Sequence, residues 1–150
     1  MDYRELCTYF SDEQKVEELL EKYSSIFEDI NETAELFQQH AIKTEEAYAE
    51  ALDRMTGNYA KLIVASDMAQ AYKEVIEDKN YLRIRNEAVD AGGKAPTADA
   101  LKVQAHASVA NYIKVRNFLG AYVSAADKKI STCQTQLKRI KRDMPREQGN

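Results

Sequence analysis

The sequence of 150 residues contains no tryptophan, only two prolines and only five glycines. Glycine and proline mark turns, so their scarcity excludes a chain built from many short strands and tight loops. Ala, Glu, Lys, Gln and Leu, which favour helices, are abundant. We therefore predict an all-α protein, and the length predicts a single helical domain over residues 1–150.

Cysteine and long apolar runs are also scarce. Cys7 and Cys133 are far apart and match no metal or redox spacing, so we expect reduced thiols, as in a cytoplasmic protein. The first residues, MDYRELCTYFSDEQ, have neither a basic region nor an apolar stretch of the kind found in signal peptides. No apolar run approaches the roughly 18 residues that a membrane span needs. We expect a cytoplasmic location and no membrane partner.

Motifs that carry catalysis are missing. The sequence has no P-loop, dinucleotide fingerprint, nucleophile elbow or zincin helix. His40 and His106 lack cysteine, histidine or carboxylate neighbours at ligand spacing. Adjacent acidic residues such as Glu17 and Glu18 do not face each other on a helix. We expect no enzyme activity, no metal and no cofactor.

The charge is unevenly distributed. Residues 1–60 carry 15 acidic and 5 basic residues, residues 61–100 carry 7 and 6, and residues 101–150 carry 3 and 10. An acidic first part and a basic last part favour either self-complementary assembly or a polyanionic partner for the basic end.

Apolar residues at helical spacing predict an acidic N-terminal helix over about 12–30, preceded by Ser11 as an N-cap. Asp29 or Asn31 could cap a new helix, so we expect a break near 29–33. A second helix is predicted over about 34–91. Its apolar positions are Tyr48, Leu52, Met55, Tyr59, Leu62, Ala69, Tyr72 and Ile76.

The segment GGKAPT interrupts the helical pattern. Gly92 can adopt the left-handed C-cap conformation, Pro96 blocks continuation of the helix, and Thr97 can cap the next one. We expect a third helix over about 98–144, with a seven-residue repeat at Ala105, Tyr112, Leu119, Ala126, Cys133 and Ile140. The fold predicted is a long antiparallel, coiled-coil-like hairpin with an additional N-terminal helix, elongated and self-associating.

Cations gather at the expected hairpin tip. Arg83 and Arg85 are about 200° apart on a helix, so one flat salt bridge does not explain both. Tyr81 could stack on an unpaired base. Glu87, Asp90 and Asp99 reduce the local field. The candidate nucleic-acid-binding residues are Lys79, Tyr81, Arg83, Arg85, Lys94 and Lys102.

A second basic patch lies in the predicted basic tail, residues 138–150. Its cations are Lys138, Arg139, Lys141, Arg142 and Arg146. They could complement the negative dipole at the end of a long helix, or they could contact nucleic-acid phosphates.

The basic-x-basic stretch Arg83-Ile84-Arg85, followed by a glycine-containing loop and KAPTADALKVQAHASVANY, resembles the UvsY-type recombination mediators of tailed phages. The resemblance covers roughly Tyr48 to Met144. It implies a non-enzymatic, helical, ring-forming homo-oligomer, located in the host cytoplasm if phage-encoded. It also implies binding to single-stranded DNA, to a recombinase and to single-strand-binding protein, with Arg83 and Arg85 contacting phosphates.

Two other functions stay open. One is a helical adaptor or assembly protein that binds only protein; pairing of Arg83, Arg85 and Lys94 with Glu87, Asp90 and Asp99 would favour it. The other is an acidic inhibitor that mimics nucleic acid, suggested by the net charge of −10 in residues 1–60.

Overall fold

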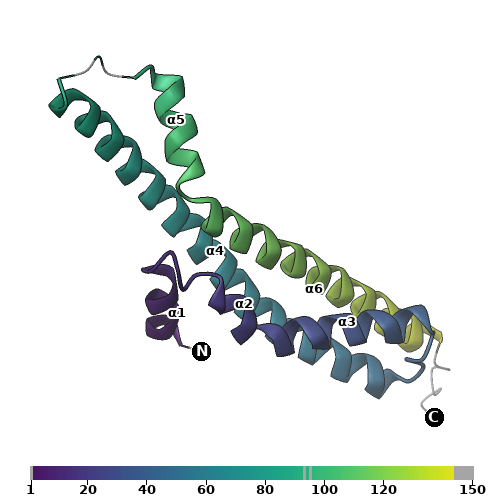
Figure 1. Cartoon of the computed structure of the whole chain (residues 1–150). Helices are drawn as coiled ribbons and strands as arrows, with labels where there is room; N and C mark the ends of the chain where they lie inside the picture. Colours follow the sequence, from purple (N-terminus) through teal and green to yellow (C-terminus); the bar gives the residue numbers. More distant parts are fainter. Residues whose placement is uncertain (1, 93, 95, 144–150) are drawn as a thin grey trace, which may run out of the picture. The chain divides into compact units, whose positions relative to one another are not determined.

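A computed structural model of the chain describes residues 2–92, 94 and 96–143. Within these residues it has six α-helices and no strand, which confirms the all-α prediction. The helices are α1 (Tyr3–Phe10), α2 (Glu18–Lys22), α3 (Ser24–Gln38), α4 (Glu45–Asp90), α5 (Ala98–Ala107) and α6 (Ala110–Asp143) (Figure 1). The two long helices, α4 and α6, pack against each other, as the predicted hairpin requires.

The described residues form two compact units. The residues of the first lie within Met1–Lys22 and Val64–Leu119, and those of the second lie within Tyr23–Ile63 and Gly120–Asn150. Helices α4 and α6 each contribute residues to both units. A single domain over the whole chain stays a prediction.

The first unit is built around α1 and the middle of the chain. Phe10 of α1 is fully buried, and its ring stacks on that of Tyr72 of α4 with 5.6 Å between centroids. The hydroxyl of Tyr112, also fully buried, donates a hydrogen bond to the Phe10 carbonyl at 2.8 Å. On the surface, Lys114 of α6 pairs with Glu17 at 3.0 Å. These contacts hold the N-terminal residues to α4 and α6.

The second unit packs α3 against the first part of α4 and the last part of α6. Asp29 of α3 accepts a hydrogen bond from the buried Asn58 amide at 2.5 Å and pairs with Arg54 Nε at 3.1 Å. The aromatic ring of Phe27 lies 4.3 Å, between centroids, from that of Tyr122. Because a buried amide is costly without a partner, the Asp29 carboxylate stabilises the α3–α4 contact.

The predicted seven-residue repeat coincides with the buried positions. Five of its six members are buried: Ala105, Tyr112, Leu119, Ala126 and Cys133. In α4, the buried residues Met55, Leu62 and Ala69 recur at the same seven-residue spacing. Residues seven apart lie on nearly the same side of a helix, so these positions form one buried face on α4 and one along α5 and α6.

The predicted N-terminal helix over about 12–30 is wrong in its bounds. An additional helix, α1, precedes it, and the residues between α1 and α2 form turns. The Asp12 carboxylate accepts a hydrogen bond from the Gln14 amide at 3.0 Å, which stabilises a turn instead of a helix. Tyr23 then separates α2 from α3 with a non-helical backbone.

The predicted break near 29–33 is also wrong, because α3 continues to Gln38. The chain turns instead at His40, which has a left-handed φ of 52°. The His40 amide donates to the Phe37 carbonyl at 3.2 Å, and the Ala41 amide donates to the Leu36 carbonyl at 2.9 Å. This pair of hydrogen bonds is the Schellman motif that closes helix C-termini. The next helix, α4, therefore begins at Glu45 and not near residue 34.

The predicted continuous helix over 98–144 is interrupted at residues 108–109, where the chain bends between α5 and α6 (Figure 1). The Ser108 hydroxyl donates to the Ala105 carbonyl at 2.6 Å and accepts from the Asn80 amide of α4 at 2.8 Å. Such side-chain hydrogen bonds compete with the helical backbone pattern. Met144 lies outside the described residues.

Candidate nucleic-acid interface

The predicted interface lies in the first unit, where α4 ends and α5 begins. Gly92 has the predicted left-handed conformation, with φ of 71°, and closes α4. The Thr97 hydroxyl accepts a hydrogen bond from the Ala100 amide at 3.3 Å and caps α5. Both local predictions are confirmed. The end of α4 at Gly92 and the start of α5 after Thr97 are therefore both set by local backbone contacts.

The predicted binding residues remain accessible. All five cations are exposed, and Tyr81 is half-buried. The exposed cations are Lys79, Arg83, Arg85, Lys94 and Lys102.

One of these cations is paired. Arg83 Nη1 lies 2.9 Å from Glu87 Oε1, one turn further along α4, and both side chains are more than half exposed. An exposed pair at this spacing contributes about 0.3–0.5 kcal/mol, so a phosphate could displace it. Among residues 2–92, 94 and 96–143, Arg85 and Lys94 form no ion pair. One of the three pairings that would favour a protein-only adaptor is therefore formed.

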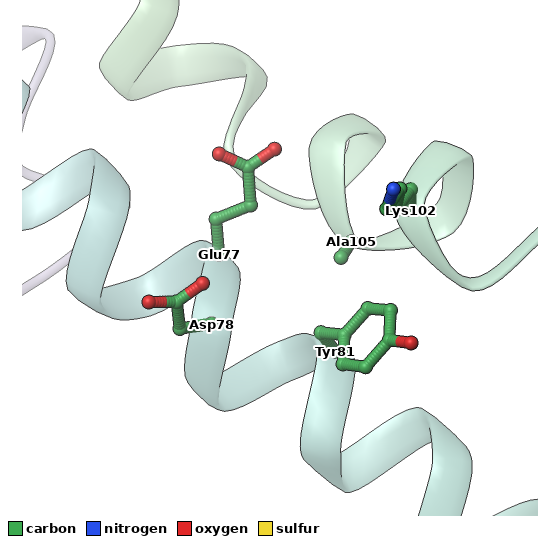
Figure 2. A pocket seen from close by; sticks show the side chains of 5 residues that line it. All are labelled: Glu77, Asp78, Tyr81, Lys102 and Ala105. Atoms are coloured by element: carbon green, nitrogen blue, oxygen red, sulfur yellow. The ribbon is translucent and has the colours of Figure 1, made fainter. Parts of the chain in front are cut away.

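Beside these cations, a groove of about 280 Å³ lies between α4 and α5. Its lining residues are Glu77, Asp78, Tyr81, Lys102 and Ala105. Figure 2 shows Tyr81 extending from α4 towards α5, with Ala105 and Lys102 on the opposite side. The groove thus combines an aromatic face, a cation and two carboxylates.

The carboxylate of Glu77 contacts one lysine and one histidine. Lys73 Nζ lies 2.5 Å from Glu77 Oε2, and His106 Nδ1 lies 2.9 Å from Glu77 Oε1. The hydrogen bond from Lys73 lowers the pKa of Glu77; partial burial opposes this shift, and the His106 contact adds to it. Glu77 is therefore an anion at neutral pH whose two oxygens already have partners, and it ties α4 to α5.

A second, more open hollow of about 590 Å³ adjoins the groove. It is lined by Glu77, Lys102, Val103, His106 and Ala107. Val103 is 69% exposed, so an apolar contact site is available beside Lys102.

Sequence reasoning identified Tyr81 and Lys102 but missed Glu77, Asp78 and His106 as lining residues. A usable signal existed: Glu77 and Tyr81 are four residues apart, as are Lys102 and His106, so each pair shares one helix face. What the sequence did not show is that these two faces oppose each other.

The second basic patch belongs to the other unit. Lys138, Arg139, Lys141 and Arg142 are exposed on α6. Lys141 lies 3.7 Å from Glu45 at the start of α4, and Arg142 lies 3.4 Å from Asp143. Arg146, the fifth predicted residue, lies outside the described residues.

Three further observations concern the described part of the chain. It contains no group of three or more His, Cys, Asp or Glu side chains that could hold a metal ion. None of its helices has the length and apolarity required to cross a membrane. Both cysteines are free thiols, and burial raises the pKa of Cys133.

No protein-family model, curated protein or solved structure matches this chain.

Proposed function

We propose that this protein is a non-enzymatic accessory protein of DNA recombination that binds single-stranded DNA as an oligomer, in the manner of the UvsY-type mediators of tailed phages. The observation that carries the proposal is the composition of the α4–α5 end of the first unit. Four exposed cations without an ion pair among the described residues, Lys79, Arg85, Lys94 and Lys102, accompany a groove that contains Tyr81.

The chemistry of these groups suits a single strand. Lysine and arginine contact phosphates in any nucleic acid, whereas an aromatic face binds bases that are not stacked in a duplex. Because Tyr81 lines a groove instead of standing free, a base must leave its neighbours to reach it. We therefore expect a preference for single-stranded over duplex DNA.

The acidic groups near the turn make each site weak, and oligomerisation offsets this weakness. Glu87, Asp90 and Asp99 are exposed near the cations. Several copies of a weak site on one oligomer raise the overall affinity through effective concentration. By resemblance, the protein partners are a recombinase and single-strand-binding protein.

The direct test is fluorescence anisotropy of a labelled single-stranded oligonucleotide at about 50 and 200 mM salt, with the matching duplex as control. We expect binding that favours the single strand and weakens steeply as salt rises. Absence of binding at the lower salt concentration would contradict the proposal.

A double substitution at the proposed site and a matched double substitution elsewhere test whether DNA binds at the α4–α5 end. In Arg85→Ala/Lys94→Ala, binding should weaken and the salt slope should fall by about 1 to 2, because each lost phosphate contact lowers it by about 1. The matched control is Lys43→Ala/Lys61→Ala, which removes two exposed cations of the second unit. Equal loss in both variants would show that only total charge matters. Circular dichroism checks that helicity is kept.

A second candidate is the helical adaptor that binds only protein. The specific observation in its favour is a stripe on α4 formed by Val75, Leu82 and Val89, which are 52%, 54% and 52% exposed. Exposed apolar residues at seven-residue spacing are typical of a helix that packs against another helix. Retained self-association without DNA binding would favour this candidate.

A further inference from the structure

The last part of α6 carries a dense positive charge (Figure 1). Residues 128–142 contain six cations and no carboxylate. Two of these cations have partners within the second unit: Lys129 Nζ lies 5.7 Å from the centre of the Phe37 ring of α3, and Lys141 Nζ lies 3.7 Å from Glu45 at the start of α4. The other four are exposed, and we call them the basic stripe: Lys128, Lys138, Arg139 and Arg142.

The basic stripe lies on one side of the helix. Successive residues of an α-helix are about 100° apart, which places all four cations within roughly 60° of Thr135. The buried residues Ala126 and Cys133 lie on the opposite side. Lys129 and Lys141 lie about 120° from Thr135, one on each flank, so they contact α3 and α4 and the other four do not. The stripe therefore runs along about 21 Å of helix surface that faces solvent.

Contacts within the chain engage the basic stripe only weakly. Arg142 Nε lies 3.4 Å from Asp143, but both side chains are largely exposed, and an exposed pair of this kind is weak. Among residues 2–92, 94 and 96–143, Lys128, Lys138 and Arg139 form no ion pair. Asp127 precedes the stripe and Asp143 follows it, so the nearest carboxylates on α6 lie at its two ends. The four cations are therefore available to an external anion.

We infer that the basic stripe is a second contact surface for the phosphates of single-stranded DNA, in addition to the α4–α5 end. The inference rests on the proposed function and extends it to the second unit, which contains these residues. Lysine and arginine neutralise phosphates whatever the base sequence. Two weak surfaces on one chain bind a single strand more tightly than either alone, because the second contact forms at a high effective concentration.

The composition of the stripe favours a phosphate chain over other anionic partners. Every exposed residue from Lys128 to Arg142 is polar or charged. A helix that lies on anionic lipid needs an apolar face that enters the membrane, and the centre of a protein interface is typically rich in aromatic and apolar side chains. This surface offers neither. Ser131 and Thr135, which lie between the cations, are short and leave the longer lysine and arginine side chains uncovered.

The test replaces two lysines of the stripe and compares them with two lysines beside it. Binding of a labelled single-stranded oligonucleotide is measured by fluorescence anisotropy between about 50 and 200 mM salt. In Lys128→Gln/Lys138→Gln the Kd should rise and the salt slope should fall by about 1.4 to 2, because each lost phosphate contact lowers it by about 0.7 to 1. The matched control, Lys129→Gln/Lys141→Gln, removes the same charge from the same helix and should lower the slope by less than half as much. Circular dichroism checks that both variants keep their helicity.

Three results would overturn the inference. Equal changes in the two variants would show that only the total charge of α6 matters, and DNA binding at the α4–α5 end would remain intact. Unchanged DNA binding in Lys128→Gln/Lys138→Gln, with a lower average mass in sedimentation equilibrium, would assign the stripe to an acidic surface of another copy. Absence of binding by the wild-type protein at the lower salt concentration would overturn the proposed function as well.

Discussion

Tyr112 of α6 forms a buried hydrogen bond with α1. Its side chain is fully buried, and its hydroxyl donates to the Phe10 carbonyl. Burial raises the pKa of Tyr112 to about 12, and the carboxylates of Glu13 and Asp12 add to the shift. The folded protein therefore holds this proton more tightly than the unfolded chain, in which tyrosine has a pKa of about 10.

Because the pKa of Tyr112 is raised in the folded protein, we expect the free energy of unfolding to fall at alkaline pH. Because the folded pKa is raised, the contribution of Tyr112 to stability is present below pH 10 and is lost as the pH rises towards about 12. Tyr112→Phe should lower the free energy of unfolding at pH 7 by about 1 kcal/mol, through loss of the hydrogen bond. At pH 11 the tighter proton binding of folded Tyr112 should have lowered the free energy of unfolding of the wild-type protein by about 1 kcal/mol, and Tyr112→Phe lacks this effect. The difference in stability between the two proteins should therefore nearly vanish at that pH.

Urea unfolding followed by circular dichroism at pH 7, 10 and 11 measures the free energy of unfolding of the wild-type protein and of Tyr112→Phe. The comparison with Tyr112→Phe isolates this residue from Tyr3 and Tyr72, whose pKa values are also raised, in both cases chiefly by a hydrogen bond with Cys7. If the free energies of unfolding of the two proteins differed by the same amount at all three pH values, the raised pKa of Tyr112 would be contradicted.

At the scale of elements, helix interiors were predicted well and helix ends less well. The apolar stripes of the long helices coincide with buried residues such as Met55, Leu62 and Leu119. The ends at Gly92 and Thr97 were predicted because glycine and threonine have strong local preferences there. The end at His40 was not predicted, since histidine seldom adopts a left-handed conformation. The break at Ser108 was missed because it depends on Asn80, which is distant in sequence.

The strained conformation at His40 gives a prediction for the end of α3. His40→Gly should raise the free energy of unfolding by about 0.5–1 kcal/mol, because glycine adopts a positive φ without the steric cost that a Cβ carries. His40 is exposed, so the substitution removes little packing. His40→Ala is the matched control and should give no gain. Urea unfolding monitored by circular dichroism measures both; equal stability of the two variants would argue against strain at this position.

At the scale of the whole molecule, the stripe of Val75, Leu82 and Val89 predicts self-association. These residues lie on α4 and are each about half exposed. Leu82→Glu should weaken the association of copies at least about fivefold, because it replaces an apolar contact of roughly 1 kcal/mol or more with a charge. The fold should be unaffected, since Leu82 is outside the buried core.

Sedimentation equilibrium over a range of concentrations tests this prediction against the chain mass of 17.1 kDa. The control is Ala60→Glu, which adds the same charge at an exposed position of α4 in the second unit. A wild-type protein that is monomeric at every concentration, or a Leu82→Glu variant with unchanged mass, would refute self-association through this stripe.

The sequence by itself determined the helical class, the seven-residue repeat of buried positions, the glycine that ends α4 and the threonine that caps α5. These features depend on periodicity and on local backbone preferences, which are properties of neighbouring residues. Only the tertiary structure decided that α1 packs against α4 through Phe10 and Tyr72, and that Tyr81 of α4 and Lys102 of α5 line one groove. Those relations join residues far apart in the chain, so they depend on how the helices pack and not on any local pattern.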